Sequence, residues 1–87
     1  MVRVVAVRPL EGFVLDLAFS DGTSKRLDVT PYLRGPIFDP LRRELALFRA
    51  VTVDPALGTI VWPNGADICP DVLREGRVPA AWDEHAA

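Results

Sequence analysis

The chain has 87 residues, of which 49% are apolar and 25% charged, and its formal net charge is −2. This length suits one small domain, and the slightly acidic balance argues against strong non-specific binding to nucleic acids, which depends on a basic surface. A single cysteine, Cys69, excludes an intramolecular disulfide and any zinc site built from paired cysteines.

The first half of the sequence predicts a three-stranded antiparallel meander. Residues 2–7 are mostly apolar and β-branched, which favours a strand that is buried on both faces or central in a sheet. Residues 13–19 alternate apolar and polar side chains, and so do residues 25–29. Because this period of two is typical of strands with one face on a core, the two segments should form a hairpin.

The length of the hairpin loop follows from the side chains that it sets opposite each other. A three-residue loop, residues 20–22, pairs Leu15 with Leu27. A two-residue turn would instead set apolar against charged side chains along the whole ladder. The longer loop also gives Gly22 a position of positive φ, where glycine carries no Cβ penalty.

The middle of the chain predicts the main helix. Asp39 is suited to cap its N-terminus and Pro40 to open it, and the helix should run on through residues 41–50, either straight or with a kink. The apolar stripe consists of Leu41, Leu45 and Phe48, and the opposite face carries Arg42, Arg43 and Arg49. This arginine face is a candidate interaction surface, although a solvated helix face is the simpler interpretation.

A second hairpin and a short helix complete the pattern. A loop of four residues, 55–58, sets Val53 opposite Ile60, with proline and glycine where the turn needs them. A short helix should follow over residues 70–76, since proline opens it and glycine ends it.

Together these elements predict an α+β fold. It has an antiparallel sheet of about five strands, the N-terminal meander plus the C-terminal hairpin, with one main helix and one short helix. Residues 1–76 should form this single compact domain, and residues 77–87 should be a C-terminal tail. The tail carries Trp82, whose large aromatic side chain favours docking on this domain or on a second copy.

The most unusual stretch runs from Trp62 to Asp67. We expect Trp62 to end a strand inside the core, Asn64 to form a turn, and Asp67 to bond backbone N–H groups ahead of the final helix. Alternatively, Asn64, Asp67 and Asp71 supply oxygen ligands to a metal ion, or Asp67 is a general base. No partner for acid–base chemistry accompanies these residues in the sequence, which favours the structural interpretation.

Side chains suited to catalysis are few. The one histidine, His85, stands close to the end of the sequence, and Cys69 lies beside a proline in an apolar context that predicts a buried, inert thiol. The glycines form no phosphate-binding motif. We therefore predict no catalytic residue, no cofactor and no metal ion.

The order of these motifs resembles the small bacterial family called domain of unknown function 2442. The resemblance covers about residues 2–75, and its most specific part is the run Trp-Pro-Asn-Gly-Ala-Asp at residues 62–67. It implies a compact α+β fold with an antiparallel sheet and one or two short helices, and no established activity, cofactor or catalytic residue. It also implies a partner, because family members often resemble partners of a small neighbouring protein in a toxin–antitoxin-like arrangement.

The chain departs from the family at one place. Relatives tend to have an Asp-Pro break after the position of Leu41, whereas this chain continues with Arg-Arg-Glu-Leu at residues 42–45. That run favours a more continuous helix.

Three functions remain open. The first, which we favour, is a non-catalytic interaction module that binds another protein or a second copy through a sheet edge or the arginine face. The second is a nucleic-acid-associated regulator using the same face, and the third is a small enzyme or metal binder using carboxylates around residues 64–71. No apolar run approaches the roughly 18 residues of a membrane span and the N-terminus lacks signal-peptide features, so we expect a cytoplasmic protein without a membrane partner.

Overall fold

The structure is a computed structural model that describes residues 2–75. It has six strands in two antiparallel sheets of three, ordered β1-β2-β3 and β4-β5-β6. The first sheet consists of β1 (Val4–Pro9), β2 (Val14–Phe19) and β3 (Ser24–Asp28), and the second of β4 (Thr52–Asp54), β5 (Thr59–Val61) and β6 (Asp67–Ile68). The α+β class and the antiparallel pairing are confirmed, whereas the expected single sheet of about five strands is wrong.

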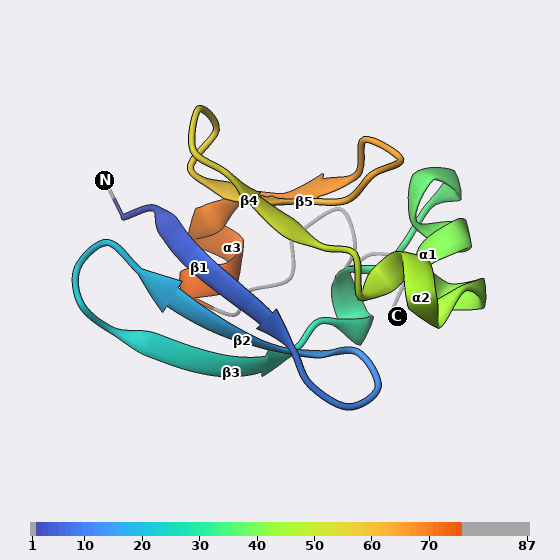
Figure 1. The fold of residues 1–87 in the computed structure, drawn as a ribbon, viewed down its shortest axis with the longest axis horizontal. Coiled ribbons are helices and arrows are strands. Elements are labelled where there is room, and N and C mark those ends of the chain that lie inside the picture. Colours follow the sequence, from blue (N-terminus) through green and yellow to red (C-terminus); the bar gives the residue numbers. More distant parts are fainter. Residues whose placement is uncertain (1, 76–87) are drawn as a thin grey trace, which may run out of the picture.

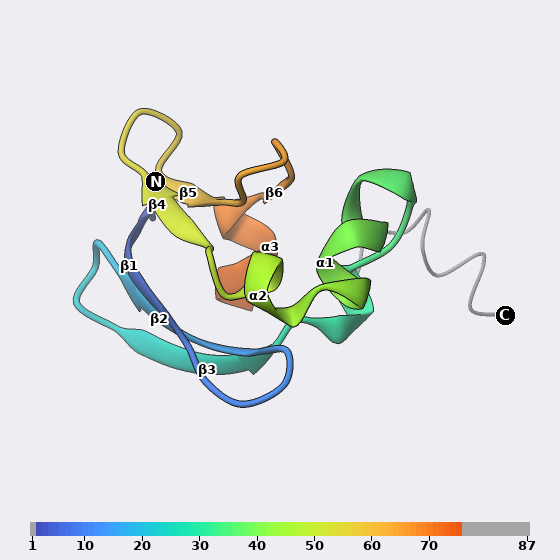
Figure 2. The same ribbon diagram turned by 45° about the vertical axis from the view of Figure 1, so that its right-hand side comes forward.

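Short helices join and cover these sheets. The 3-10 helices are η1 (Thr30–Tyr32) and η2 (Pro36–Phe38), and the α-helices are α1 (Asp39–Arg43), α2 (Leu45–Phe48) and α3 (Pro70–Glu75). Figures 1 and 2 show the sheets as two layers with α3 between them, and in Figure 1 α1 and α2 lie together at the right-hand end. No helix of the described residues is long and apolar enough to cross a membrane.

The first hairpin has the register that its side chains predict. Leu15 lies opposite Leu27, and the N–H of Phe19 donates to the carbonyl of Thr23 at 2.8 Å, which leaves three residues in the loop. Gly22 has a φ of 89°, a backbone conformation that glycine adopts without strain. The hairpin is therefore determined by alternation and by its turn.

Strand β1 differs from its prediction as a strand that is central or buried on both faces. It is an edge strand, and although Val4 is buried, Val5 and Ala6 are exposed. The register shifts between Val4 and Ala6, so Val5 is the extra residue of a β-bulge. Pro9 fits this edge, because it sits opposite Leu15 and its missing N–H faces away from β2.

The second hairpin also has its predicted register, with Val53 opposite Ile60 and a loop of residues 55–58. The element that sequence analysis missed is β6, where Ile68 pairs with Ile60. This strand has two residues, too short to show alternation. Its addition completes a second sheet instead of extending the first.

The expected continuous helix over residues 41–50 is broken. Glu44 has φ −116° and ψ 98°, an extended conformation that ends α1 and starts α2. As a result Leu41 and Phe48 are both buried, whereas Leu45, predicted on the same stripe, is 48% exposed. The break redirects α2 so that Phe48 reaches the ring of Trp62, with 5.8 Å between the ring centroids.

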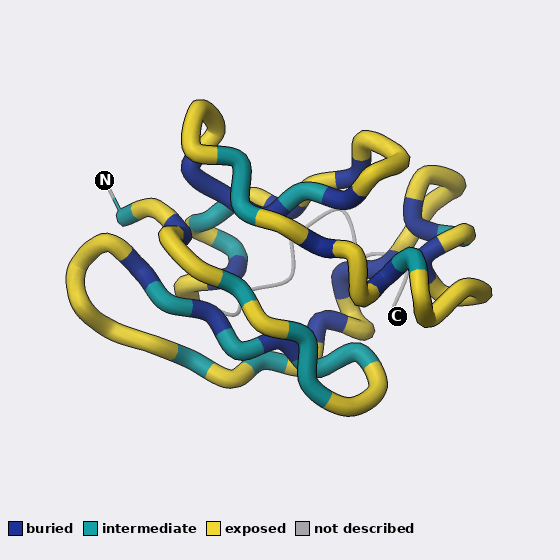
Figure 3. The backbone as a smooth tube through the Cα atoms, viewed as in Figure 1, coloured by how far each residue is buried: buried dark blue, intermediate teal, exposed yellow. Residues whose placement is uncertain are grey.

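One core lies between the layers and appears as the dark segments in Figure 3. Both sheets and the helices contribute to it. Its largest fully buried side chains are Phe48, Leu15, Leu17, Leu33, Leu41, Ile60 and Leu73. Helix α3 covers Pro70–Glu75, close to its prediction, and it supplies Leu73.

Candidate functional site

Two of the three arginines of the predicted interaction face, Arg42 and Arg49, donate hydrogen bonds to backbone carbonyls of other segments of the chain. Arg42 donates to the carbonyl of Leu33 and forms an ion pair with Asp39. Arg49 donates to the carbonyl of Leu10 at 2.6 Å, which ties α2 to the loop after β1. Asp39 thus pairs with an arginine side chain, and it does not cap the helix with its carboxylate.

Arg43, the third arginine of this face, is exposed and forms no hydrogen bond or ion pair with another described residue. Since the other two guanidinium groups donate to backbone carbonyls of different segments, they have fewer donors left for a phosphate. The arginine face therefore presents less free positive charge than the sequence suggests.

Trp62 lies in the core as predicted, and it is 3% exposed. Its indole Nε1 donates to the carbonyl of Phe48 at 2.8 Å, and its ring packs edge-on against Phe38 at 6.1 Å between centroids. These contacts join the second sheet to the helical end of the molecule. Trp62 is a packing residue with a buried polar contact.

The turn after Trp62 is held by Asn64. Its Oδ1 accepts from the N–H of Ala66 at 3.2 Å, and its Nδ2 donates to the carbonyl of Ile37 at 2.8 Å. The expected cap by Asp67 is wrong, because its carboxylate is exposed on β6 and makes no hydrogen bond with another described residue. Asn64 makes the local bonds here because it precedes the turn N–H groups, whereas Asp67 is already part of a strand.

No reactive or metal-binding cluster is found among residues 2–75. Cys69 is exposed, so the expectation of a buried thiol is wrong: the proline that follows begins α3 at the surface. Groups of three or more potential metal ligands do not occur in the part of the chain that the structure describes. Trp82, His85 and the rest of the tail, 77–87, lie outside the described residues, so docking of the tail stays a prediction.

A groove that the sequence does not predict lies between β1 and the β4–β5 hairpin. This groove, here called the valine groove, has a cavity volume of about 290 Å³ and is lined by Arg3, Val4, Val5, Val53, Pro55 and Gly58. Its geometry depends on the β1 bulge, and on the hydrogen bond that the N–H of Val4 donates to the carbonyl of Gly58 at 2.9 Å.

One strongly exposed apolar side chain, Val5, lines the valine groove, and a second, Leu57, belongs to the hairpin loop that supplies the lining residues Pro55 and Gly58. Val5 and Leu57 are each 56% exposed, more than any other large apolar residue of the described chain. Arg3 lies over Gly58 and donates to the carbonyl of Pro55, so one cation stands at this apolar surface. One signal was available in the sequence: Leu57 is a large apolar residue inside a hairpin loop, where polar residues are usual.

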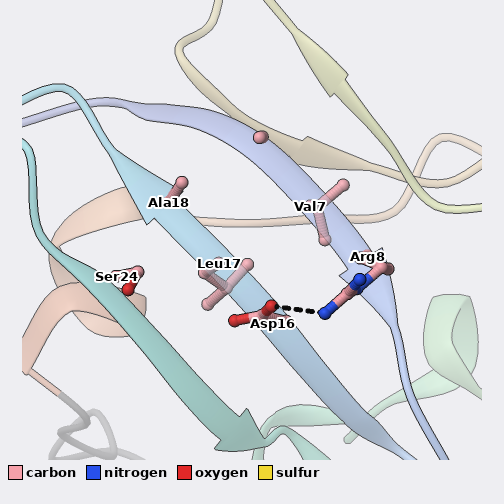
Figure 4. Close-up of a pocket in the computed structure, with 7 residues that line it drawn as sticks. Val7, Arg8, Asp16, Leu17, Ala18 and Ser24 are labelled. Atoms are coloured by element: carbon pink, nitrogen blue, oxygen red, sulfur yellow. Dashed lines mark hydrogen bonds and ion pairs between the residues drawn. The ribbon is translucent and has the colours of Figure 1, made fainter.

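A second hollow lies on the outer face of the first sheet, with a cavity volume of about 160 Å³ (Figure 4). Small side chains form it where Ala6, Ala18 and Ser24 lie side by side across three strands. At one end Arg8 and Asp16 form an ion pair at 3.1 Å. Small side chains thus form the hollow, and an ion pair between β1 and β2 stands at one end of it.

The comparisons with known proteins identify the family. The model of the family described as "Protein of unknown function (DUF2442)" matches residues 4–79, most of the chain. The chain therefore belongs to this family, as its motif order indicates. No curated protein and no solved structure matches it.

Proposed function

We propose that this member of the DUF2442 family is a non-catalytic protein-interaction module that binds another polypeptide at the valine groove. The observation that carries the proposal is Val5, which lines the groove and is 56% exposed, with the equally exposed Leu57 in the hairpin loop whose Pro55 and Gly58 also line the groove. Contiguous apolar surface around a hollow is typical of a docking site, whereas single exposed apolar residues are ordinary.

The exposed apolar area at the groove limits how much binding free energy it can supply. Full burial of a valine or leucine side chain stabilises by about 1.5–3 kcal/mol, so covering the exposed halves of Val5 and Leu57 is worth about 2 kcal/mol together. That corresponds to an affinity gain of about 30-fold. A partner that inserts one apolar side chain here gains a central contact, which the rest of the interface must supplement.

The positive charge of Arg3 favours a partner with an acidic side chain. Arg3 uses part of its guanidinium group on the carbonyl of Pro55, and its remaining N–H groups suit a carboxylate. The partner we propose is a polypeptide with an apolar anchor next to an acidic side chain. The small neighbouring protein suggested by the family resemblance, in a toxin–antitoxin-like arrangement, is the first partner to examine.

The other functions have less support from the described residues. A nucleic-acid regulator would use the arginine face, where Arg42 and Arg49 are already bonded within the chain. A carboxylate-based enzyme or metal site around residues 64–71 would need converging oxygen atoms, and Asp67 stands on a strand whereas Asp71 stands in the first turn of α3. A cytoplasmic location is part of the proposal.

The test removes the apolar character of the groove and preserves its shape. The double variant Val5→Thr, Leu57→Gln keeps the size of both side chains and a β-branched residue in the strand. The matched control is Leu45→Gln, at a similarly exposed leucine on α2. Tagged wild-type protein and both variants are expressed in the native host, and the proteins that co-purify are quantified by mass spectrometry.

We expect one protein to co-purify with the wild type and the control and to fall about 30-fold with the double variant. Binding measured with that purified partner should weaken by the same factor. Co-purification that is equal for all three proteins refutes the groove as the site. Capture of DNA or RNA that is lost at high salt and in Arg43→Gln supports the nucleic-acid function instead and also refutes the proposal.

A further inference from the structure

The outer edge of β3 is unpaired within the described residues. The strand order places β3 at the end of the first sheet, with β2 on one side. The N–H of Val29 donates to the carbonyl of Phe13 at 2.9 Å. Counted from this pair, every second pair of residues along the β2–β3 hairpin is a hydrogen-bonded pair. Hence Lys25 and Leu27 bond β2, whereas the backbone groups of Ser24, Arg26 and Asp28 point away from the sheet.

The side chains on this edge have opposite charges. Arg26 and Asp28 alternate with Lys25 and Leu27, so the two pairs lie on opposite faces of the sheet, and both Arg26 and Asp28 are exposed. Arg26 forms no ion pair within residues 2–75, because Asp16, its cross-strand neighbour, is paired with Arg8.

Asp28 is a stable negative charge. Its Oδ1 accepts from the hydroxyl of Thr30 at 2.6 Å and from the N–H of the same residue at 3.0 Å. These two bonds, the hydroxyl first, hold the pKa of the Asp28 carboxyl below its usual range. The second oxygen of the carboxylate remains available for an arginine.

We propose that β3 pairs antiparallel with β3 of a second copy of this chain, with Arg26 of each copy opposite Asp28 of the other. This inference is independent of the valine groove, which lies beside β1 and the second sheet. The two copies then form one continuous sheet across the β3 edge.

A two-fold axis at each of the five residues of the strand gives one register. An axis at Ser24 sets the strand against the hairpin loop of the other copy, which leaves four registers to compare. An axis at Lys25 or at Arg26 sets two cations directly opposite each other, and an axis at Asp28 sets two carboxylates opposite each other. An axis at Leu27 sets the two leucines opposite each other and forms the Arg26–Asp28 pair twice. In that register the outward backbone groups of Arg26 and Asp28 also face each other and exchange hydrogen bonds.

The experiment exchanges these charges. Arg26→Glu alone makes both cross-strand pairs acidic, and Asp28→Lys alone makes both basic. In an equimolar mixture of the two variants, the introduced glutamate of one copy faces the introduced lysine of the other, and the native Asp28 faces the native Arg26, so both pairs are restored. Arg43→Glu is the matched control, since it makes the same charge change at an exposed arginine away from β3.

We measure mass by sedimentation equilibrium over a wide concentration range, after circular dichroism has shown that each variant is folded. The wild type and Arg43→Glu should dimerise, each β3 variant alone should dimerise about 30-fold more weakly, and the mixture should recover the wild-type affinity. If Asp28→Lys does not fold, Asp28→Asn replaces it, because the amide oxygen preserves the turn. Its mixture with Arg26→Glu should then dimerise more tightly than Arg26→Glu alone.

Three results overturn the proposal. The first is a wild-type chain that stays monomeric at every concentration, which is expected if residues 76–87 occupy the β3 edge. The second is a dimer whose affinity Arg26→Glu leaves unchanged. The third is a mixture of folded variants that does not regain the wild-type affinity.

Discussion

Replacing Trp62 by phenylalanine separates the two contributions of this side chain to stability. The phenyl ring keeps most of the packing against Phe38 and Phe48 but removes the Nε1–H that donates to the carbonyl of Phe48 at 2.8 Å. That carbonyl keeps a second, longer bond from the N–H of Val51 at 3.3 Å, so the lost hydrogen bond should cost about 1 kcal/mol. The smaller ring adds about 1–2 kcal/mol for the space it leaves in the core.

We therefore expect Trp62→Phe to lower the free energy of unfolding by about 2–3 kcal/mol, and Trp62→Ala to lower it by about 3–5 kcal/mol. For a small domain with about 5–15 kcal/mol in total, the alanine variant approaches complete unfolding.

Urea unfolding followed by far-ultraviolet circular dichroism measures both values, because this signal comes mainly from the backbone and follows unfolding in both variants. A loss below about 0.5 kcal/mol for Trp62→Phe would refute the buried hydrogen bond and the tight packing around it. Equal losses for the two variants would show that ring packing contributes nothing.

Three further predictions concern turns. Gly58→Ala should destabilise the protein by about 1–2 kcal/mol and lower the thermal midpoint, because φ there is 70° and the guanidinium carbon of Arg3, 2.8 Å from the new Cβ, must also move; an unchanged midpoint would refute the positive φ. Asn64→Ala should cost about 1 kcal/mol in urea unfolding, and Asn64→Asp less, because the carboxylate still accepts in the turn although it cannot donate to η2. The hydroxyl and the N–H of Thr23, with help from an arginine, lower the pKa of Asp21 to about 2; its stabilisation should therefore be complete above about pH 4 and disappear as the pH falls toward 2. Asp21→Asn should remove that part of the pH dependence of the melting temperature, and an identical profile would show that the turn does not hold the carboxylate.

Local pattern was sufficient for the hairpins and for α3. Alternation and the loop around Gly22 determine that Leu15 lies opposite Leu27, and proline and glycine determine the loop of residues 55–58. These features depend on residues close together in the chain, where side-chain period and turn chemistry act directly. The core position of Trp62 is equally visible in the sequence, because a large aromatic ends an apolar strand.

Contacts between distant segments decided the rest. The break at Glu44 satisfies no local preference, and it is required because Phe48 must reach the indole of Trp62 while Leu41 stays buried. The valine groove exists because β1 and the β4–β5 hairpin, some fifty residues apart in the chain, meet where Arg3 crosses Gly58. Helical period and strand alternation describe one element at a time, so they do not specify which edge a strand takes or which carbonyl an arginine finds. The position of a strand in its sheet and the partner of an arginine are determined when the two sheets pack around one core. Only in that packed state does the burial of one segment's apolar surface depend on where the other segments lie and on which polar groups they pair.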